Sequence, residues 1–305
     1  MRKRNEKIAV ISVPLGKGAG AAGAELGAKS MLEEGNLPAK LEQLGVQYEL
    51  SEVPYSYLIG TETAAEDTKG MKHLAEVLDV NVRLADEVRR AVDGGRMPLV
   101  LGGDHSIAIG TIAGLAEEGG KLGVIWIDAH SDLNTPETSP SGNIHGMSLA
   151  ASLGVGDSRL TSIRGIIPKL DPKHVAIVGA RSLDAGEKAF IRSLGIACYT
   201  MHDIDKLGIA KVMSKVIKGM KAAGCRVHLS FDIDSLDPRE APGTGTPVRG
   251  GLGYREAHLA LELLYQSGII ASAEFVEVNP LLDTDYRTAK LAVELIGSLL
   301  GEQIL

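Results

Sequence analysis

The chain has 305 residues, of which 44% are hydrophobic and 23% are charged, and its formal net charge is −7. These values are typical of a globular protein with a large core, and the charge argues against nucleic-acid binding, which needs a basic face. No apolar run approaches the ~20 residues of a membrane helix, and the short apolar stretch after the basic residues 1–4 lacks a cleavage site. We therefore expect a soluble, cytoplasmic protein with neither a membrane nor a nucleic-acid partner.

Short β-branched runs alternate along the chain with longer segments of helical periodicity. In chain order, the predicted strands cover residues 8–13, 47–53, 98–101, 122–127, 174–178, 196–199, 227–232 and 272–277. The predicted helices cover residues 28–44, 71–94, 106–118, 186–194, 208–223, 254–267 and 284–300. The alternation, with strands that are almost wholly apolar, predicts an α/β fold with one mostly parallel sheet of about eight strands and helices on both sides. No composition break indicates a linker, so residues 1–305 are expected to form one domain.

Four of the predicted strands end in polar residues that can carry chemistry. Gly-Gly-Asp-His at 102–105 follows one strand, and Asp-Ala-His-Ser-Asp at 128–132 follows another. Asp232 and Asp234 close a third strand, and Glu277 closes a fourth. Ligands of open parallel sheets bind beyond the carboxyl ends of the strands, where loops converge. We therefore expect the four strand ends to form one site.

The acidic residues at these strand ends predict a bound cation. An unpaired buried carboxylate is costly, and alternate residues of an extended chain share a face, so Asp128, His130 and Asp132 can point together. Asp232 and Asp234 can do the same. Carboxylate oxygens with a minority of imidazole nitrogens favour manganese over zinc, with cobalt and iron left open. Two ions would need a shared carboxylate, and water that bridges metals ~3.5–4 Å apart can be deprotonated near neutral pH.

Three motifs resemble the signatures of the ureohydrolase family, which includes arginase, agmatinase and formiminoglutamase. They are G-G-D-H-S at 102–106, D-A-H-S-D at 128–132 and S-F-D-I-D-S-L-D-P at 230–238, in the family's order. Within the family, the segments N-T-P at 134–136, S-G-N-I-H-G at 141–146 and E-F-V-E-V-N-P at 274–280 are similar to those of arginases. The likeness covers nearly the whole chain.

The resemblance implies a three-layer α/β/α sandwich that binds two Mn²⁺ ions. It assigns one ion to His105, Asp128, Asp132 and Asp232, and the other to His130, Asp128, Asp232 and Asp234, so that Asp128 and Asp232 bridge. The implied reaction is hydrolysis of L-arginine to L-ornithine and urea by a metal-bridging hydroxide. A strong, well-oriented nucleophile is needed because the guanidinium carbon is a poor electrophile.

The same resemblance implies roles for residues around the metals. Glu277 would hold the guanidinium by charge-assisted hydrogen bonds, His145 would give a proton to the departing amine, and the metal ligand Asp132 counts with them as catalytic. The substrate-binding residues would be Asn134, Ser139 and Ser141 at the α-carboxylate, Asp184 at the α-amino group, and Thr246 in the guanidinium pocket. The family also implies a homo-oligomer, a trimer or a hexamer, with residues 254–256 at an interface.

Two other interpretations of the function stay open. Another ureohydrolase, such as agmatinase or guanidinobutyrase, would act on a substrate that lacks the α-carboxylate, the α-amino group or both. A catalytically silent relative would serve as a binding or scaffolding subunit. Ser182 and Pro140 depart from the residues usual in arginases, and both fall near the amino-acid end of the substrate.

A glycine-rich loop raises a further alternative. G-A-G-A-A-G at 18–23 follows the first strand and matches the G-x-G-x-x-G pattern of dinucleotide-binding proteins. The second strand ends near Glu52, later than that fold requires, and the metal cluster has no place in a nicotinamide enzyme. Related arginases carry arginines and a Gly-Pro pair here, so the role of residues 16–24 is left open.

Several other residues are expected to be structural. Glu274 is interpreted as an ion-pair partner, Asp237 with Pro238 as a turn, and Trp126 as a strand-core residue. Cys198 and Cys225 lack a metal or redox spacing and are expected in the core of a protein from a reducing compartment. The remaining histidines fall outside these clusters of candidate site residues and are expected to be packing or surface residues: His73, His174, His202, His228 and His258.

Overall fold

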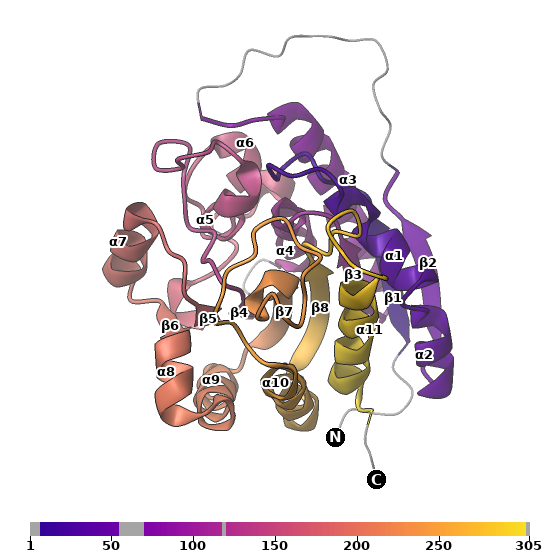
Figure 1. The fold of residues 1–305 in the computed structure, drawn as a ribbon. Helices are drawn as coiled ribbons and strands as arrows, with labels where there is room; N and C mark the ends of the chain where they lie inside the picture. The colour runs from indigo at the N-terminus through magenta and orange to yellow at the C-terminus, as the bar shows by residue number, and fades with distance from the viewer. Residues whose placement is uncertain (1–6, 55–69, 118–119, 303–305) are drawn as a thin grey trace.

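Eight parallel strands form the centre of the molecule (Figure 1). The computed structural model describes residues 7–54, 70–117 and 120–302, so the basic residues 1–4 considered above lie outside the described residues. The strands are β1 (Ile8–Val13), β2 (Tyr48–Glu52), β3 (Met97–Gly102), β4 (Leu122–Ile127), β5 (Val175–Ala180), β6 (Ala197–Thr200), β7 (Arg226–Asp232) and β8 (Ile270–Val276). Their order across the sheet is β2-β1-β3-β8-β7-β4-β5-β6, and these strands all pair in parallel. The predicted parallel sheet of about eight strands is confirmed.

Helices cover both faces of this sheet. They are α1 (Gly27–Glu33), α2 (Leu37–Gln43), α3 (Leu74–Asp93), α4 (Ala108–Leu115), α5 (Ser148–Ser152), α6 (Ser158–Thr161), α7 (Ala185–Leu194), α8 (Met201–Leu207), α9 (Ile209–Ala223), α10 (Tyr254–Ser267) and α11 (Arg287–Leu300). β1, β3, β4 and β5 are buried along their whole length, as parallel strands between two helical layers must be. The fold is therefore the expected three-layer α/β/α sandwich.

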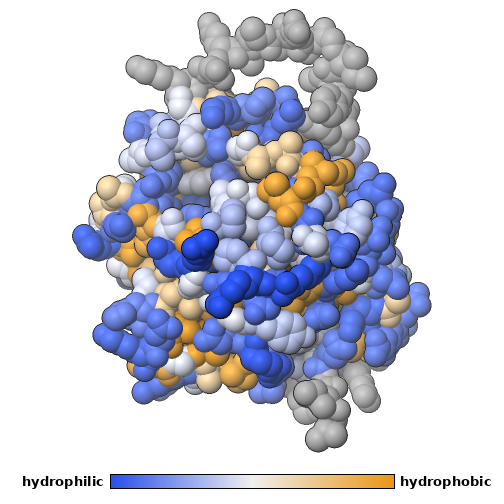
Figure 2. Space-filling model, in the orientation of Figure 1, coloured by the Kyte–Doolittle hydropathy of each residue, from blue (hydrophilic) through white to orange (hydrophobic). Residues whose placement is uncertain are grey.

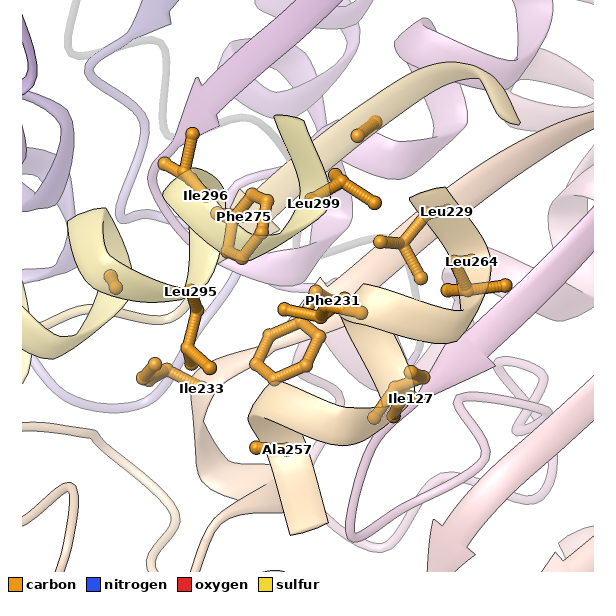
Figure 3. Packing of buried hydrophobic residues seen from close by; sticks show 14 of the residues in the cluster. Ile127, Leu229, Phe231, Ile233, Ala257, Leu264, Phe275, Leu295, Ile296 and Leu299 are labelled. Carbon is orange, nitrogen blue, oxygen red and sulfur yellow. The ribbon is translucent and has the colours of Figure 1, made fainter. Parts of the chain in front are cut away.

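Two hydrophobic cores join the sheet to its helical layers. On one face, α1, α2 and α8 to α11 pack against alternate strand residues such as Phe231 and Phe275, whose ring centroids lie 5.2 Å apart. Figure 3 shows this core with Leu295 and Leu299 of α11 beside the two rings. On the other face, α3, α4 and α5 pack against the strand residues that point to that face, such as Trp126. Successive strand residues point to opposite faces, so each strand contributes to both cores.

The single helix predicted over residues 28–44 is wrong. The structure has α1 and α2 instead, separated at Gly35 and Asn36. A Cβ at position 35 would lie 2.7 Å from the Val293 side chain of α11, and Asn36 has a φ of 55°. The chain therefore breaks where α11 packs closely against it. Pro38 lies in the first turn of α2, a position that proline favours, so part of the signal was present in the sequence.

Two further expectations need correction. Helix α8 was not predicted, because its seven residues are too few for a clear periodic pattern. Its start carries a reciprocal cap, in which Asp203 accepts a hydrogen bond of 2.9 Å from the backbone N–H of Thr200. Cys198 and Cys225 are free, but they are half-buried at the margins of the two cores and not inside them.

The strand order explains why distant sequence motifs meet. β3, β8, β7 and β4 are consecutive neighbours in the middle of the sheet. Near their carboxyl ends, Leu101 pairs with Phe275, Phe275 with Phe231, and Phe231 with Ile127. The four motif-bearing loops therefore leave the sheet side by side, at the edge where ligands of open parallel sheets bind.

The surface is polar over most of the face shown in Figure 2, where hydrophobic residues gather in small patches. The exposed large hydrophobic side chains include Leu281 and Leu282, in the segment between β8 and α11. Within the described ranges, no helix combines the length and the apolar character that crossing a bilayer requires.

Candidate metal centre and active site

Two groups of acidic and imidazole side chains meet at the carboxyl ends of the central strands and share Asp128. In the first, here called the His105 group, His105 Nδ1 lies 3.2 Å from Asp128 Oδ2 and 3.1 Å from Asp132 Oδ2. In the second, the His130 group, His130 Nδ1 lies 3.4 Å from Asp128 Oδ1 and 3.1 Å from Asp234 Oδ2. Asp128 thus directs one oxygen to each group, the arrangement predicted for a bridging ligand.

Asp232 joins the His105 group from the end of β7. Its Oδ2 lies 3.1 Å from His105 Nδ1, and its Oδ1 accepts a hydrogen bond of 2.7 Å from the backbone N–H of Asp234. This bond turns the chain into a short 3₁₀ segment, Ile233–Ser235, which brings Asp234 to the site. With Asp232, all six residues predicted as metal ligands lie together.

Local backbone geometry directs these carboxylates. Asp128 Oδ1 accepts a hydrogen bond of 2.7 Å from the His130 backbone N–H. Asp132 has a φ of 51°, in the left-handed region that a residue other than glycine seldom adopts. The backbone N–H groups of Leu149 and Ala150 each donate a hydrogen bond of 3.1 Å to its carbonyl oxygen. Such strain costs about 1–3 kcal/mol and persists where the surroundings impose the conformation, most often at functional sites.

Crowding of the carboxylates shifts their pKa values. Burial, together with the charge of Asp128, raises the pKa of Asp132 to about 6. Burial and the charges of Asp234 and Asp128 raise the pKa of Asp232 well above its ordinary value. Burial alone would lower the pKa of His130, but hydrogen bonds to Asp128 and Asp234 raise it to about 12. The site therefore carries an excess of negative charge that favours cations.

Glu277 and His145, which were expected to act on the substrate separately, are hydrogen-bonded to each other. Oε1 of the buried Glu277 lies 3.0 Å from His145 Nδ1 and accepts a hydrogen bond of 2.8 Å from the His105 backbone N–H. Burial would raise the pKa of Glu277, but the bond to His145 holds it below its ordinary value. Burial would lower the pKa of His145, but Glu277 and then Asp132 raise it to about 9. At neutral pH the pair is a carboxylate facing a protonated imidazole.

The backbone at Glu277 is also left-handed, with a φ of 63°. Its N–H donates a hydrogen bond of 2.9 Å to the Gly103 carbonyl, which ties the end of β8 to the turn after β3. A Cβ at position 103 would lie 1.8 Å from the Leu15 carbonyl oxygen, so this turn admits only glycine. The second glycine of the G-G-D-H motif therefore lets the turn pack against Leu15 after β1, while its carbonyl holds the backbone of Glu277.

A cavity of about 120 Å³ opens onto His130 of the His130 group and onto Asp132 and Asp232 of the His105 group. His145 lines it, and so do five of the six residues predicted to bind the substrate: Asn134, Ser139, Ser141, Asp184 and Thr246. The sixth, Glu277, is not among the lining residues. Ser139 and Ser141 also shape their own loop, because their hydroxyl oxygens accept hydrogen bonds from the backbone N–H groups of Gly142 and Asn143, at 3.0 and 3.2 Å. The structure thus brings five of the predicted substrate residues, from the loops after β4, β5 and β7, to one cavity.

Some of these residues are bonded to one another. Asn134 Nδ2 donates a hydrogen bond of 2.9 Å to Asp184 Oδ2, and Asn134 Oδ1 accepts one of 3.0 Å from the Thr138 hydroxyl. The Thr246 hydroxyl donates a hydrogen bond of 2.8 Å to Asp234 Oδ2. Asn134 and Asp184 therefore form one unit, whereas Thr246 connects the cavity wall to the His130 group.

Sequence reasoning missed two residues that support the His105 group. The Trp126 ring stacks on the His105 ring with centroids 4.0 Å apart, and its Nε1–H donates a hydrogen bond of 2.9 Å to Asp128 Oδ2. Ser230 Oγ lies 2.7 Å from His105 Nε2. Both had a signal, since each precedes an assigned aspartate by two residues and shares its face of the strand.

Two other missed residues had no such signal. Arg181 donates hydrogen bonds to the backbone carbonyls of Asp234 and Val248, both at 2.7 Å, and so holds the loop after β7. Glu187, which is buried and lines the cavity, accepts a hydrogen bond of 2.7 Å from the Ser131 hydroxyl. Their partners lie some fifty residues or more away in the chain, beyond the reach of local patterns.

The glycine-rich loop packs beneath the site. Gly18 donates a backbone hydrogen bond of 2.8 Å to Asp104 Oδ2, and its carbonyl accepts one of 3.1 Å from the His145 N–H. Asn279 Nδ2 donates to the Ala22 carbonyl at 2.9 Å. A Cβ at position 18 would lie 2.4 Å from Asp104 Oδ1 and 2.4 Å from Ser106 Oγ, so close packing against the segment after β3 explains this glycine.

His228 is a buried packing residue outside the two metal groups, as expected, but it also contacts polar side chains. Its Nδ1 lies 3.0 Å from Ser272 Oγ, and its Nε2 lies 3.3 Å from Glu274 Oε1. Glu274 is therefore placed as the ion-pair partner that the sequence analysis expected. Both side chains are fully buried, so this pair belongs to the core beneath the His105 group.

Proteins of known family are similar to this chain in sequence and in fold. The arginase family profile matches residues 6–301. The arginase of Bacillus caldovelox is 51% identical, with 98% of this chain and 99% of that protein covered, and that of Bacillus subtilis (strain 168) is 50% identical, with 99% and 100% covered. The solved native structure of the Bacillus caldovelox arginase has a TM-score of 0.94 at 50% identity, with 98% and 100% covered. The arginase of Entamoeba histolytica in complex with L-ornithine has a TM-score of 0.88 at 35% identity, with 99% and 100% covered. The chain belongs to the arginase family.

Proposed function

We propose that the chain hydrolyses L-arginine to L-ornithine and urea. The observation that carries this proposal is the pair of acidic groups sharing Asp128, at the ends of four adjacent strands, in a member of the arginase family. The related arginase that was solved with L-ornithine supports that amino acid as the product. The cavity beside the His130 group offers a place for a small substrate.

The residues fit two divalent cations, which we take to be Mn²⁺. Each group offers one imidazole nitrogen and at least two carboxylate oxygens within 4.8 Å of one another, a donor set that suits manganese. The raised pKa values of Asp132 and Asp232 mark repulsion that cations would offset. One ion would be held by His105, Asp128, Asp132 and Asp232, and the other by His130, Asp128, Asp232 and Asp234.

When bound, the two ions supply an activated water as nucleophile near neutral pH, and they stabilise developing negative charge. The protein's own contribution begins with the orientation of the guanidinium. Glu277 is held as a carboxylate, and its Oε1 is fixed by the His105 N–H and by His145. Its other oxygen can accept hydrogen bonds from the guanidinium and set the angle of attack.

His145 holds the proton that the leaving group requires. Its pKa of about 9 keeps the imidazole protonated at neutral pH, and the ring lines the cavity. When the bond between the guanidinium carbon and the side-chain nitrogen breaks, that nitrogen needs a proton to leave as an amine. His145 is placed to donate it, while the 3.0 Å contact with Glu277 fixes the ring. Asp132, which is in contact with His105, adds to the field that retains this proton.

The loop residues of the cavity wall would recognise the amino-acid end of the substrate. Asn134, Ser139 and Ser141 would face the α-carboxylate, and Asp184 the α-amino group. The 2.9 Å bond between Asn134 and Asp184 holds an amide and a carboxylate side by side, which matches adjacent anionic and cationic groups. Thr246, through Asp234, would line the guanidinium end.

We further propose that residues 1–305 act as one domain, in the cytoplasm, within a homo-oligomer (a trimer or a hexamer). The resemblance to arginases supports an interface at residues 254–256, which lie at the start of α10. Sedimentation of the purified protein would measure the number of subunits.

Urea release from L-arginine, agmatine and guanidinobutyrate, with added Mn²⁺, tests the proposed activity. We expect L-arginine to be the preferred substrate. Asn134→Ala and Ser141→Ala should each lower kcat/KM for L-arginine about 10-fold, the effect of one lost hydrogen bond, and leave residual turnover of agmatine unchanged. Unaltered turnover of L-arginine by both variants would show that the substrate is another guanidino compound. If no such compound releases urea, the chain is a silent binding subunit.

A further inference from the structure

A ladder of buried polar side chains runs along β7 and β8 toward the metal centre. His228 and Ser230 of β7 pair in register with Ser272 and Glu274 of β8. Each is at most 1% exposed. Alternate strand residues share a face, so the next β7 residue on this face is Asp232 of the His105 group. Apolar side chains would fill this interior more cheaply, and the polar ladder therefore requires an explanation.

The hydrogen bonds of the ladder have a fixed direction. The Ser230 hydroxyl donates to Glu274 Oε1 at 2.7 Å, because a carboxylate can only accept. Burial would raise the pKa of Glu274, but the facing His228 holds it below its ordinary value, so the carboxylate stays ionised. A serine hydroxyl has one proton, and that proton is used in the hydrogen bond to Glu274. Ser230 Oγ must therefore accept a hydrogen bond from its other neighbour, His105 Nε2, which lies 2.7 Å away.

This direction determines the tautomer of His105. With a proton on Nε2, the neutral ring has its lone pair on Nδ1, the atom within 3.2 Å of carboxylate oxygens of Asp128, Asp132 and Asp232. A neutral histidine ligates a metal only through its unprotonated nitrogen. The ring is also fixed in plane by its stacking on Trp126.

We propose that Glu274, supported by His228, is a positioning residue of the metal centre that acts on His105 through Ser230. This proposal rests on the proposed metal site and gives a reason for the buried carboxylate at position 274. Glu274 sets the polarity of the chain, so that His105 offers Nδ1 to a divalent cation without first having to change its tautomer. A purely structural ion pair with His228 would have no influence on metal binding.

An isosteric change separates these two roles. In Glu274→Gln the side-chain volume is kept, but an amide can turn its N–H₂ toward Ser230. Ser230 would then accept from Gln and donate to His105 Nε2, which places the ring proton on Nδ1 and blocks the metal. Asp237→Asn is a matched control, because Asp237 is also a buried carboxylate near the end of β7 but bonds to Arg239 and Gly250.

The experiment is a titration of the metal-free full chain with Mn²⁺, followed by equilibrium dialysis and by electron paramagnetic resonance. Wild type and Asp237→Asn should bind two ions and give the spectrum of a coupled pair. Glu274→Gln should fold, keep one ion and bind the other about 10–100-fold more weakly, as is typical when an outer partner of a metal-ligating histidine is lost. Its spectrum at low metal should be that of an isolated ion.

A double-mutant cycle with Ser230→Ala completes the test. If Glu274 acts through Ser230, Glu274→Gln should have no further effect on Mn²⁺ affinity once the hydroxyl is gone, whereas independent sites would give additive losses. If Glu274→Gln binds two ions with wild-type affinity, or if the losses in the two variants are additive, the role of Glu274 is overturned but the metal centre is not. Wild-type protein that bound no Mn²⁺ would overturn the metal centre itself, and this proposal with it. Should Glu274→Gln not fold, Ser230→Ala, which leaves Glu274 in place, should show the same loss of one ion. Full binding by Ser230→Ala would overturn the relay.

Discussion

The His105 group and the His130 group contain similar atoms, but the protein holds them differently. The His105 side chain is 1% exposed, is stacked on Trp126 and has Ser230 at its second nitrogen. The His130 side chain is 26% exposed and lines the cavity. The first histidine is therefore fixed by the core before any substrate arrives, whereas the second is in a position to respond to the substrate.

The largest expected effect comes from Asp128, because its two oxygens serve both groups and its loss breaks both at once. We predict that Asp128→Ala binds neither ion firmly and that urea production falls to background, since each ion would keep too few anionic ligands. Asp232→Ala should behave alike if Asp232 also bridges. Metal analysis and a urea assay measure the two effects together.

A control shows whether this loss is specific. Asp157→Ala removes an aspartate that caps the peripheral helix α6, where it accepts a hydrogen bond of 2.9 Å from the Arg159 N–H. It should cost about 1 kcal/mol of stability and leave the metal content unchanged. Two Mn²⁺ ions retained by Asp128→Ala would show that the two groups are not joined by a shared ligand.

A change at His145 separates catalysis from metal binding, because this residue lines the cavity and is assigned to neither ion. His145→Ala should keep both ions and slow turnover by on the order of 10²-fold, the lower range for loss of a general acid. Metal content and kcat, measured on the same sample, separate the two effects. A rate equal to that of wild type across the pH range would remove the proposed role.

The same variant has a pH-dependent effect on stability in the metal-free protein. The folded pKa of about 9 lies above the ordinary value of 6.5. The contribution of the protonated ring, at most about 3 kcal/mol, is thus complete below about pH 6.5 and lost as the pH rises through about 9. In urea unfolding, the difference in unfolding free energy between wild type and His145→Ala should decrease as the pH rises over this interval. His202→Ala, at an exposed position, is the control for the loss of a histidine side chain.

The sequence predicted the parts of the molecule that depend on local pattern. β1 and β4 begin and end at the predicted residues, because their apolar runs are bounded by polar or glycine-rich segments. Five of the six candidate ligands were found for a similar reason, since alternate residues of an extended chain share a face. The sixth, His105, was found from its place in the G-G-D-H motif directly after a predicted strand. The resemblance to ureohydrolases added the assignment of these residues to two ions.

Contacts between distant segments could not be predicted in this way. The bond between His145 and Glu277 joins residues 132 positions apart, and that between Asn134 and Asp184 joins residues 50 apart. Each depends on loops whose course is set by the whole sheet. The break between α1 and α2 has a similar cause, because the close approach of α11 at Gly35 is a tertiary contact. Pro38 gave a local signal for the break, but the packing of α11 against Gly35 could not be read from the local pattern.

The smallest expected effect is the difference in stability between two histidine variants, and not the loss that each variant causes. His105→Ala and His130→Ala remove the same atoms, so a difference in the unfolding free energy of the metal-free protein reports their surroundings. Loss of the buried His105 leaves three carboxylates without their common partner and should cost about 3–5 kcal/mol. Loss of the partly exposed His130 should cost about 1–3 kcal/mol, because water can reach the remaining carboxylates. Urea unfolding at fixed pH measures both, with the exposed His202→Ala as the control. Equal losses of unfolding free energy, or a greater loss for His130→Ala, would mean that the core does not hold His105 more firmly than His130.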